Sequence, residues 1–251
     1  MFRIRLFVAV FAFVTAVCCL PGSGFAETAT FSASQKSEIE HLVRNYLVKN
    51  PEVLVEAMTE LRTRQQLAEK DELNKALAKN RSALLNDPKT PVAGNPQGDV
   101  SVVEFYDYSC PYCKSVEDNL KALLKADDKV RLVLKEFPVL GTGSTLAAKA
   151  ALASQAQGKF LEFHEALMTA RGQFTEESLM RVAKSVGLDT ARLKADMESS
   201  SVESALAANM ALAEDLNLRG TPAFVIGDRL FPGVIDLKAM KQAVAEARKK
   251  K

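Results

Sequence analysis

The stretch Val100–Cys113, VSVVEFYDYSCPYC, decides the fold of this chain. It opens with a run of β-branched and aromatic residues, which predicts a buried strand. Cys110 and Cys113 come directly after that strand, and the residues from there to about Lys125 follow a helical pattern. A Cys-x-x-Cys pair at the junction of a strand and a helix indicates a redox-active dithiol much more strongly than the same pair elsewhere.

Their positions give the two cysteines different predicted roles. Cys110 faces the unpaired N–H groups at the positive end of the helix, which favour its thiolate and predict that it is the nucleophile. Cys113, one turn inside the helix, is expected to be the resolving thiol. Pro111 between them fixes φ and suits a helix start. A purely structural disulfide is disfavoured, because a two-residue loop hardly constrains the unfolded chain.

Metal binding is the chemical alternative to redox exchange. A structural zinc site needs about four ligands. Beyond the first 26 residues the only Cys and His side chains are Cys110, Cys113, His41 and His164. The two histidines lie in separate helical segments, and we expect His164 to be a structural residue of its helix. A soft metal such as Cu(I) could be held by the two thiolates alone, and this alternative stays open.

The rest of this region predicts the order β-α-β, a helical block, then β-β-α. Val130–Phe137 (VRLVLKEF) is the second predicted strand, although Lys135 and Glu136 interrupt its apolar run. The helical block extends from about Thr145 to Asn217. A strand then follows a Thr-Pro pair, a Gly-Asp dipeptide predicts a tight hairpin, and a last helix starts near Asp236. The corresponding residues are Gly220-Thr221-Pro222, Ala223–Ile226, Gly227-Asp228 and Leu230-Phe231.

Residues 105–113 (FYDYSCPYC), together with Gly220-Thr221-Pro222, resemble the DsbA-like thiol–disulfide oxidoreductases. The resemblance spans about Val100 to Lys249. It implies an α/β thioredoxin fold with a helical insertion at about 143–218. It also implies that Pro222 is cis and that Thr221 presents its backbone to a substrate strand. Only ~5% of X–Pro bonds are cis, so the expectation is sharp.

Two further positions take their roles from the same resemblance. Tyr112 stands where the strongest oxidants of the family carry His, which implies a milder oxidant. Glu104 is a charge inside an apolar strand, on the face shared by Val102 and Tyr106. A buried carboxylate must be paired or neutral. The resemblance matches Glu104 to a buried acid that manages the proton of Cys113; a solvated strand end is the alternative. Among the charges that interrupt the second strand, Lys135 is the natural counter-charge for Glu104.

The first 26 residues have the pattern of a secretory signal peptide. Arg3 and Arg5 precede an uncharged stretch that is shorter than the ~20 residues of a membrane span. Gly24-Phe25-Ala26 then predicts cleavage after Ala26, and an uncleaved anchor is the alternative. Cleavage would remove Cys18, Cys19 and two of the 33 basic residues, which leaves basic and acidic residues equal at 31. We therefore expect a periplasmic protein, in a compartment where disulfides persist.

Composition excludes several other classes of protein. The chain has 251 residues, of which 47% are hydrophobic and 25% charged. These are ordinary globular values, and they exclude a disordered chain or a disulfide-dense scaffold. A net charge of +2 gives no electrostatic argument for binding nucleic acid, so no nucleic-acid partner is expected.

Residues 27–90 predict an N-terminal helical extension. Ser37, three residues before Glu40, predicts a capping box at the start of a helix to about Val48, with Ser34 as the other candidate. Asn50-Pro51-Glu52 starts a second helix. There is no Gly or Pro from Glu52 to Asp87, so a continuous helix there would reach ~54 Å. Its apolar patches predict that the helix either packs on another copy of the chain or acts as a stalk. The alternative is a surface helix that lies on its own domain.

A Pro- and Gly-rich stretch, Asp87–Gly98, then predicts a linker before a domain at 91–251. The extension resembles that of the ScsC group and Com1-like proteins, which implies a homo-oligomer, dimer or trimer, through residues 27–90. The predicted function is a periplasmic thiol–disulfide oxidoreductase, oxidase or isomerase. Its substrates would be exported proteins, with a membrane redox partner and no cofactor beyond the cysteine pair. The alternative is a copper-binding protein that protects against copper stress through the same dithiol.

Overall fold

The computed structural model describes residues 31–250, so the predicted signal peptide lies outside the described residues. The chain divides into two compact units after Leu61, within its second helix. In chain order the elements are α1 (Ala33–Lys49), α2 (Glu52–Lys79), α3 (Arg81–Leu85), β1 (Val92–Gly94), β2 (Val100–Tyr106), α4 (Pro111–Ala126), β3 (Val130–Glu136), α5 (Thr142–Ser154), the 3-10 turn η1 (Gln155–Gln157), α6 (Phe160–Thr169), α7 (Glu176–Ser185), α8 (Thr190–Met197), α9 (Ser200–Asp215), β4 (Ala223–Ile226), β5 (Arg229–Pro232) and α10 (Leu237–Lys249).

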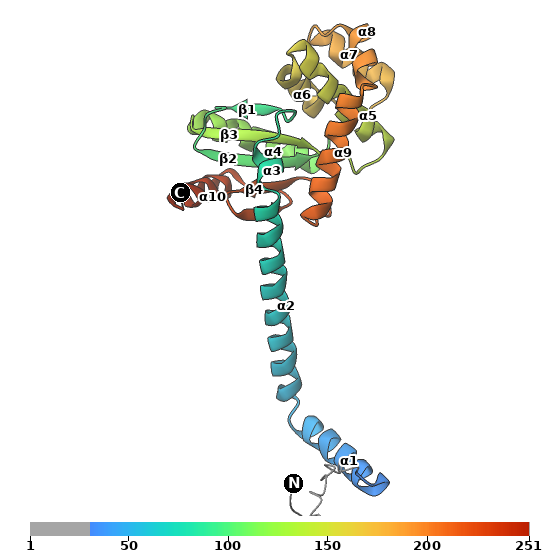
Figure 1. The fold of residues 1–251 in the computed structure, drawn as a ribbon, viewed down its shortest axis with the longest axis vertical. Coiled ribbons are helices and arrows are strands. Elements are labelled where there is room, and N and C mark those ends of the chain that lie inside the picture. The colour runs from blue at the N-terminus through green and yellow to red at the C-terminus, as the bar shows by residue number, and fades with distance from the viewer. Residues whose placement is uncertain (1–30, 251) are drawn as a thin grey trace, which may run out of the picture. The chain divides into compact units, whose positions relative to one another are not determined.

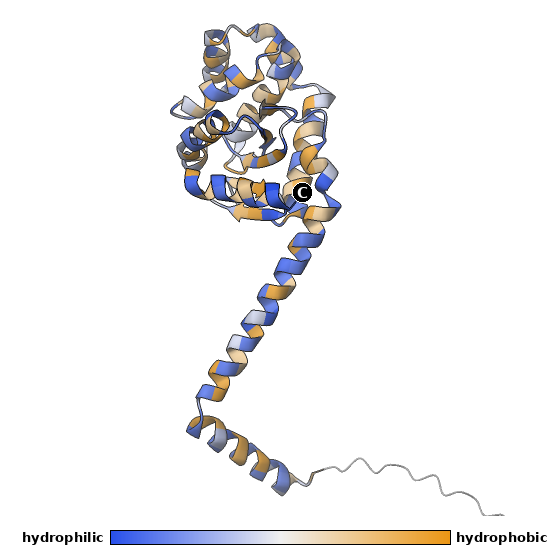
Figure 2. Ribbon diagram, turned by 90° about the vertical axis from the view of Figure 1, so that its left-hand side faces the viewer, coloured by the Kyte–Doolittle hydropathy of each residue, from blue (hydrophilic) through white to orange (hydrophobic). Residues whose placement is uncertain are grey.

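The first helix begins earlier than predicted. Its N-cap is Ser32, whose side chain accepts from the Gln35 N–H while the Gln35 side chain accepts from the Ser32 N–H. This reciprocal pair occupies the capping-box position, so the predicted Ser37–Glu40 box is wrong, and Ser34 and Ser37 are interior helix residues. The alternation of apolar and polar residues along α1 and α2 is visible in Figure 2. α1 buries none of its residues.

The predicted continuous helix from Glu52 to Asp87 is interrupted at Asn80. The Asn80 side chain donates to the Ala76 carbonyl and to Asp215, and α3 starts after it. The two apolar patches of this segment have different environments. Leu54, Met58 and Leu61 are exposed. Leu77 and Leu84 are buried in the core of the larger unit, so the second patch packs on the chain's own sheet.

A five-stranded sheet in the order β1-β3-β2-β4-β5 forms the centre of the larger unit. β2 and β3 are parallel, and the other neighbouring pairs are antiparallel. The edge strand β1 is a correction to the sequence analysis, because it lies within the predicted linker. It pairs with β3 from Val92 opposite Val133, and Pro91 accepts a further bond from the Leu134 N–H. A proline just before an edge strand is compatible with such pairing, because its carbonyl can still accept from β3 and only one donor is lost at the edge of the sheet.

Each face of this sheet is covered by helices (Figure 1). α4 and α10 pack on one face, where Val102 and Tyr106 of β2 point into the core. The end of α2, α3 and α9 pack on the other face, around Val103 and Phe105. β2 is therefore buried on both sides, as its nearly continuous apolar run predicts.

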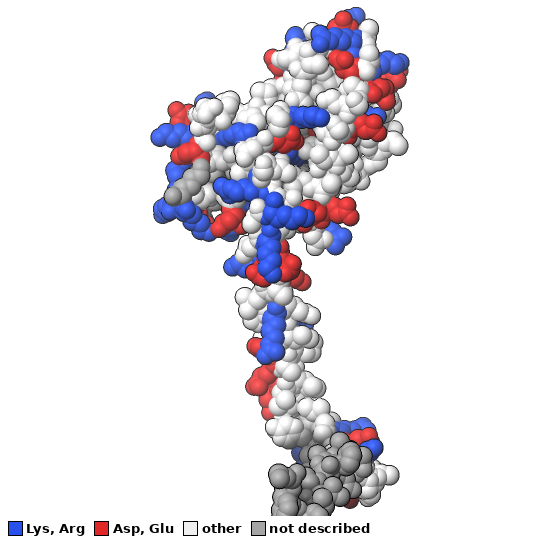
Figure 3. Space-filling model, in the orientation of Figure 1, with Lys and Arg blue, Asp and Glu red and all other residues white. Residues whose placement is uncertain are grey.

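The predicted helical insertion between β3 and β4 is confirmed as α5 to α9. The predicted hairpin is also confirmed: Gly227 has φ +64° in the turn between β4 and β5, a conformation that favours glycine. Among the described residues, no helix is both long enough and apolar enough to cross a membrane. Over the part of the larger unit that faces the viewer in Figure 3, Lys and Arg are interspersed with Asp and Glu, without a field of one sign.

Candidate active site

The turn between β2 and α4 is built around Asp107. Its carboxylate accepts from the Ser109 N–H at 2.7 Å, and its carbonyl accepts from the Cys110 N–H at 3.0 Å. The other carboxylate oxygen accepts from the N–H groups of Val139 and Leu140. Asp107 thus joins the dithiol turn to the loop after β3. This role of Asp107 was not predicted, although an Asp after a strand is a known turn-forming signal.

Cys110 is the N-cap of α4, and Pro111 occupies the first turn, as predicted. Both cysteines are free thiols and both are buried. The Cys110 thiol donates to the Thr221 carbonyl oxygen at 3.3 Å. Cys113 lies inside the helix with no exposed surface, and burial raises the pKa of its thiol. The two sulfurs therefore differ in environment, Cys110 at the helix end and Cys113 in the apolar interior.

The Thr221–Pro222 peptide bond is cis, which confirms the expectation from the resemblance. β4 begins at the next residue, Ala223, opposite Phe105 of β2. This pairing brings the Thr-Pro loop to the end of β2 that carries the dithiol. The carbonyl of Pro222 accepts from the Gly233 N–H, which closes the far side of the loop.

Glu104 is completely buried, so the alternative of a solvated strand end is wrong. Burial raises the pKa of its carboxyl well above the usual range, and the nearby Glu117 and Glu136 carboxyls add to the effect. Neither carboxyl oxygen has a hydrogen-bond partner among the described residues. Burial therefore favours the neutral form of Glu104, and its carboxylate form would raise the pKa of the Cys113 thiol further.

Lys135 is not the counter-charge of Glu104. In the β2–β3 register, Lys135 is opposite Phe105, so it belongs to the other face of the sheet. Its buried ammonium lies 3.3 Å from the Asp87 carboxylate and also donates to Thr90. The predicted pair of Glu104 and Lys135 is wrong because Lys135 lies one position beyond the register partner of Glu104, and adjacent positions in a strand point to opposite faces.

The neighbouring Glu136 is on the same face as the dithiol. Its Oε1 accepts from the phenol groups of Tyr106 at 2.6 Å and Tyr108 at 3.1 Å. The Tyr108 oxygen also lies 2.9 Å from Nδ1 of His164 on α6. His164 is buried, which lowers its pKa to about 3 and keeps it neutral, in agreement with the structural role expected for it. This group of residues was not predicted, although Tyr106 and Glu136 are partners in the register of β2 on β3.

The surface beside the dithiol is exposed to solvent. Tyr112 between the two cysteines is 64% exposed, and Val139 and Leu140 are exposed in the adjoining loop. A groove of about 890 Å³ runs from Ser109 and Pro111 to the loop at residues 170–176. No group of three or more His, Cys, Asp or Glu side chains in the described part of the chain is arranged to hold a metal ion.

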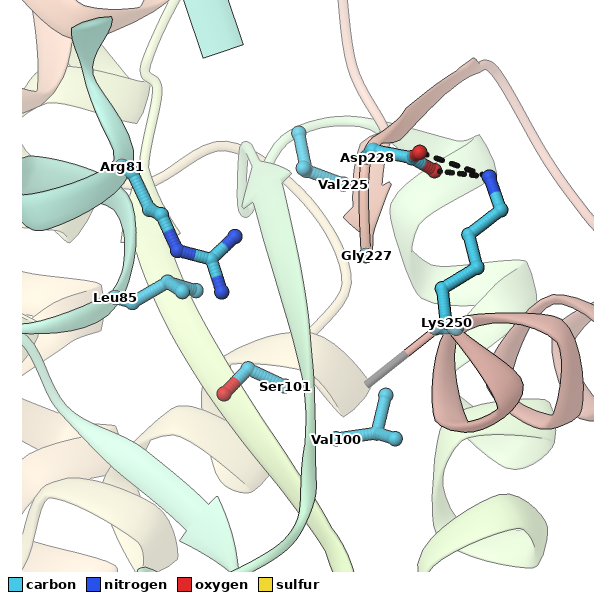
Figure 4. Close-up of a pocket in the computed structure, with 9 residues that line it drawn as sticks. Arg81, Leu85, Val100, Ser101, Val225, Gly227, Asp228 and Lys250 are labelled. Carbon is cyan, nitrogen blue, oxygen red and sulfur yellow. Dashed lines mark hydrogen bonds and ion pairs between the residues drawn. The ribbon is translucent and has the colours of Figure 1, made fainter. Parts of the chain in front are cut away.

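A second hollow lies at the opposite end of β2 (Figure 4). Its volume is about 230 Å³, and its walls come from α3, the start of β2, the β4–β5 turn and the end of α10. Asp228 and Lys250 form an ion pair of 2.8 Å at its rim. None of the predicted site residues lines this hollow.

Comparison with known proteins matches two family models to the chain. A DsbA-like thioredoxin domain matches residues 101–245, and the N-terminal domain of the copper resistance protein ScsC matches residues 35–68. A relative is the Na⁺/H⁺ antiporter NhaA 3 of Salinispora tropica, 30% identical over 62% of this chain. The match spans only 24% of the antiporter's length.

Two solved structures are similar to this chain. A thioredoxin-like oxidoreductase from Silicibacter pomeroyi is 50% identical with a TM-score of 0.67, over 68% of this chain and 98% of that one. A linker-deletion mutant of ScsC from Proteus mirabilis is 31% identical with a TM-score of 0.68, over 89% of this chain and 100% of that one. The chain therefore belongs to the family of DsbA-like thioredoxin-domain proteins, and it carries an N-terminal domain of the ScsC type.

Proposed function

We propose that this protein is a periplasmic thiol–disulfide oxidoreductase that forms or isomerises disulfides in exported proteins. The observation that carries the proposal is the contact of 3.3 Å between the Cys110 thiol at the start of α4 and the carbonyl of Thr221, the residue before Pro222. This contact puts the nucleophile next to a backbone segment that can bind a substrate strand. The oxidoreductase named among the similar structures agrees with such chemistry.

In the oxidising direction, a substrate thiolate attacks the Cys110 sulfur of the Cys110–Cys113 disulfide. The bond between the two cysteines breaks, and Cys113 leaves with the electron pair. A second substrate thiolate then attacks the substrate sulfur of the mixed disulfide and releases Cys110 as a thiolate. The dithiol has gained two electrons, which a membrane redox partner must remove.

In the isomerising direction, the Cys110 thiolate attacks a wrong substrate disulfide and expels one substrate thiolate. Another substrate thiolate later attacks the mixed disulfide and frees Cys110, with no net transfer of electrons. The exposed Tyr112 lies where either kind of substrate would contact the protein. Pro111 and Tyr112 are accordingly proposed to tune Cys110, and Thr221 to bind the substrate backbone.

Glu104 is proposed to handle the proton of the buried cysteine. As Cys113 leaves, its thiolate would be an unpaired charge in the apolar interior, which is costly. Glu104 is neutral and equally buried, so it can give its proton to that sulfur, and its carboxylate is then reprotonated from solvent. When Cys113 closes the disulfide again, the steps run in reverse: Glu104 first loses its proton to solvent and then takes the proton of the Cys113 thiol.

The N-terminal part of the protein is proposed to form a homo-oligomer through residues 27–90. Within residues 31–61, α1 and the first turns of α2 expose a series of large apolar side chains. These are Ile39, Leu42, Val43, Tyr46, Val48, Leu54, Val55, Met58 and Leu61. Burial of each large apolar side chain contributes about 1.5–3 kcal/mol, so a second copy that covers this series would be bound firmly.

The proposed activity is tested by refolding reduced ribonuclease and scrambled ribonuclease with the protein. Cys110→Ser should abolish both reactions, and full activity of this variant would show the proposal to be wrong. Copper protection through the same two free thiols is the second candidate, favoured by the position of both thiols on one helix turn. Tight Cu(I) binding without any turnover on disulfides would favour that role instead.

A further inference from the structure

A buried polar cluster that the exchange steps above do not use lies next to the dithiol turn. It consists of Tyr106, Tyr108, Glu136 and His164, and we call it the Glu136 cluster. Its members come from the end of β2, the turn before Cys110, the end of β3 and α6 of the insertion. All four side chains are 97% or more buried. The cluster therefore joins the thioredoxin sheet and the helical insertion at the segment that leads to the nucleophile.

The hydrogen bonds converge on one oxygen atom. Oε1 of Glu136 accepts from both phenol groups, at 2.6 Å and 3.1 Å, while the Tyr108 oxygen is 2.9 Å from the His164 ring nitrogen. Since the Tyr108 hydroxyl donates to Glu136, it accepts from Nδ1–H of His164. This direction leaves Nε2 of the imidazole without a proton, facing the Glu117 carboxyl at 3.9 Å.

Ring packing holds the same residues in place. The His164 ring stacks on Phe160 and meets the Tyr106 ring edge-on, with centroids 5.6 Å and 5.0 Å away. Burial raises the pKa of Glu136 well above its usual range and lowers that of His164, so both are neutral. Oε2 of Glu136 has no hydrogen-bond partner among the described residues, so the contacts that fix the arrangement of the cluster are those at Oε1 and the packed rings.

We propose that Glu136 is a positioning residue for Cys110, acting through Tyr108. Tyr108 lies two residues before Cys110, in a segment outside the helices and strands. Asp107 anchors this segment to the loop after β3, and Tyr108 anchors it to Glu136 and to α6. With both anchors in place, the turn has one position, and Cys110 stays at the N-terminus of α4 and at the Thr221 carbonyl.

This inference rests on the proposed role of Cys110 as the nucleophile, but its test does not require turnover. The rate of Cys110 alkylation by iodoacetamide is measured from pH 4 to 9 in the fully reduced protein, beside thermal unfolding. Glu136→Leu removes the acceptor, and Tyr108→Phe removes one hydroxyl. We expect both to lower the rate at neutral pH roughly two- to fivefold, the size of a helix-terminus contribution, with the pH profile moved to higher pH.

Two further variants separate positioning from stability. Glu136→Gln keeps an oxygen that accepts both phenol groups, so it should recover most of the rate lost in Glu136→Leu. Leu193→Ala, in the buried core of the insertion, should lower thermal stability and leave the alkylation profile at the wild-type position. If Glu136→Leu does not fold, Tyr108→Phe carries the test alone.

The result that overturns the inference is a folded Glu136→Leu or Tyr108→Phe protein with the wild-type alkylation profile. A profile that moves equally in Leu193→Ala would also overturn it, since general loosening would then explain the effect. If the wild-type protein shows no disulfide exchange at all, the proposed function fails. The alkylation profiles would still decide whether the Glu136 cluster positions Cys110.

Discussion

The Cys110 thiol donates to the carbonyl oxygen of Thr221 at 3.3 Å, although 111 positions separate the two residues. The insertion accounts for most of that separation, and the pairing of β2 with β4 closes it. One sulfur and one backbone carbonyl are thus brought together by the sheet rather than by local sequence. A substrate strand bound at Thr221 would lie directly over the nucleophile.

Cys113→Ser should trap the mixed disulfide between Cys110 and a substrate. With the resolving thiol gone, the covalent intermediate breaks down only when a further substrate thiol attacks it. Non-reducing electrophoresis of periplasmic extracts should show adducts that disappear on reduction. Cys110→Ser is the matched control and should form none, because Cys113 is fully buried. Equal adducts in both variants would contradict the assignment of roles.

Glu104→Gln should change how stability depends on pH. Burial raises the pKa of the Glu104 carboxyl in the folded protein above its unfolded value. The folded state then holds this proton more tightly than the unfolded state does. The resulting contribution to the free energy of unfolding is fully present below the unfolded pKa and is lost as the pH rises toward the folded pKa. Gln cannot ionise, so the Glu104→Gln variant does not lose stability in this way as the pH rises.

Urea unfolding of the reduced proteins measures the effect. The stability of Glu104→Gln relative to wild type should be greater at pH 8 than at pH 5. Glu214→Gln, which changes an exposed glutamate of α9, is the control and should show no such trend. A parallel dependence of wild type and Glu104→Gln on pH would mean that Glu104 is ionised in the folded protein throughout this range.

Asp87→Ala should destabilise the larger unit by about 3 kcal/mol, because it leaves the Lys135 ammonium buried without its anionic partner. The two groups are 3.3 Å apart and Lys135 is 1% exposed. Lys135→Met replaces the ion with an apolar chain of similar length and should cost clearly less. The double variant should resemble Lys135→Met alone. Urea denaturation checks all three, and additive losses in the double variant would exclude the coupling.

Local sequence patterns were sufficient for the elements that carry the chemistry. The apolar run of β2, the dithiol at the start of α4, and the Gly227 hairpin all have short-range signals, and the structure contains each of them. The cis bond before Pro222 came from the resemblance, since no local pattern specifies it. The edge strand β1 was missed because three residues beside prolines and glycines look like a linker until β3 supplies their partners.

The buried charges could not be assigned from single-strand counting. Glu104, Lys135 and Glu136 all interrupt apolar strands, and their partners are set by the register of β2 on β3 and by segments distant in the sequence. Lys135 forms an ion pair with Asp87, which lies in the stretch predicted to be a linker. Glu136 finds Tyr108, whose own second partner is on the insertion. Register and insertion packing are tertiary facts, so these partners were beyond local reasoning.

The exposed apolar residues of the N-terminal unit predict self-association. Light scattering of residues 27–251 should give a mass of two or more chains. Leu54→Glu combined with Met58→Glu puts charges on the apolar patch of α2 and should reduce the mass to that of one chain. Charged groups without partners in an apolar interface cost several kcal/mol, so even a strong oligomer should dissociate.

A matched control distinguishes this interface from general apolar exposure. Leu161→Glu changes an exposed leucine of α6 in the insertion, and it should leave the oligomer intact. Because the dithiol lies in residues 62–250, the dissociated variant should keep the wild-type rate of Cys110 alkylation. A single-chain mass for the unmodified protein at micromolar concentration would refute the oligomer. Dissociation by Leu161→Glu would instead place the interface on the insertion.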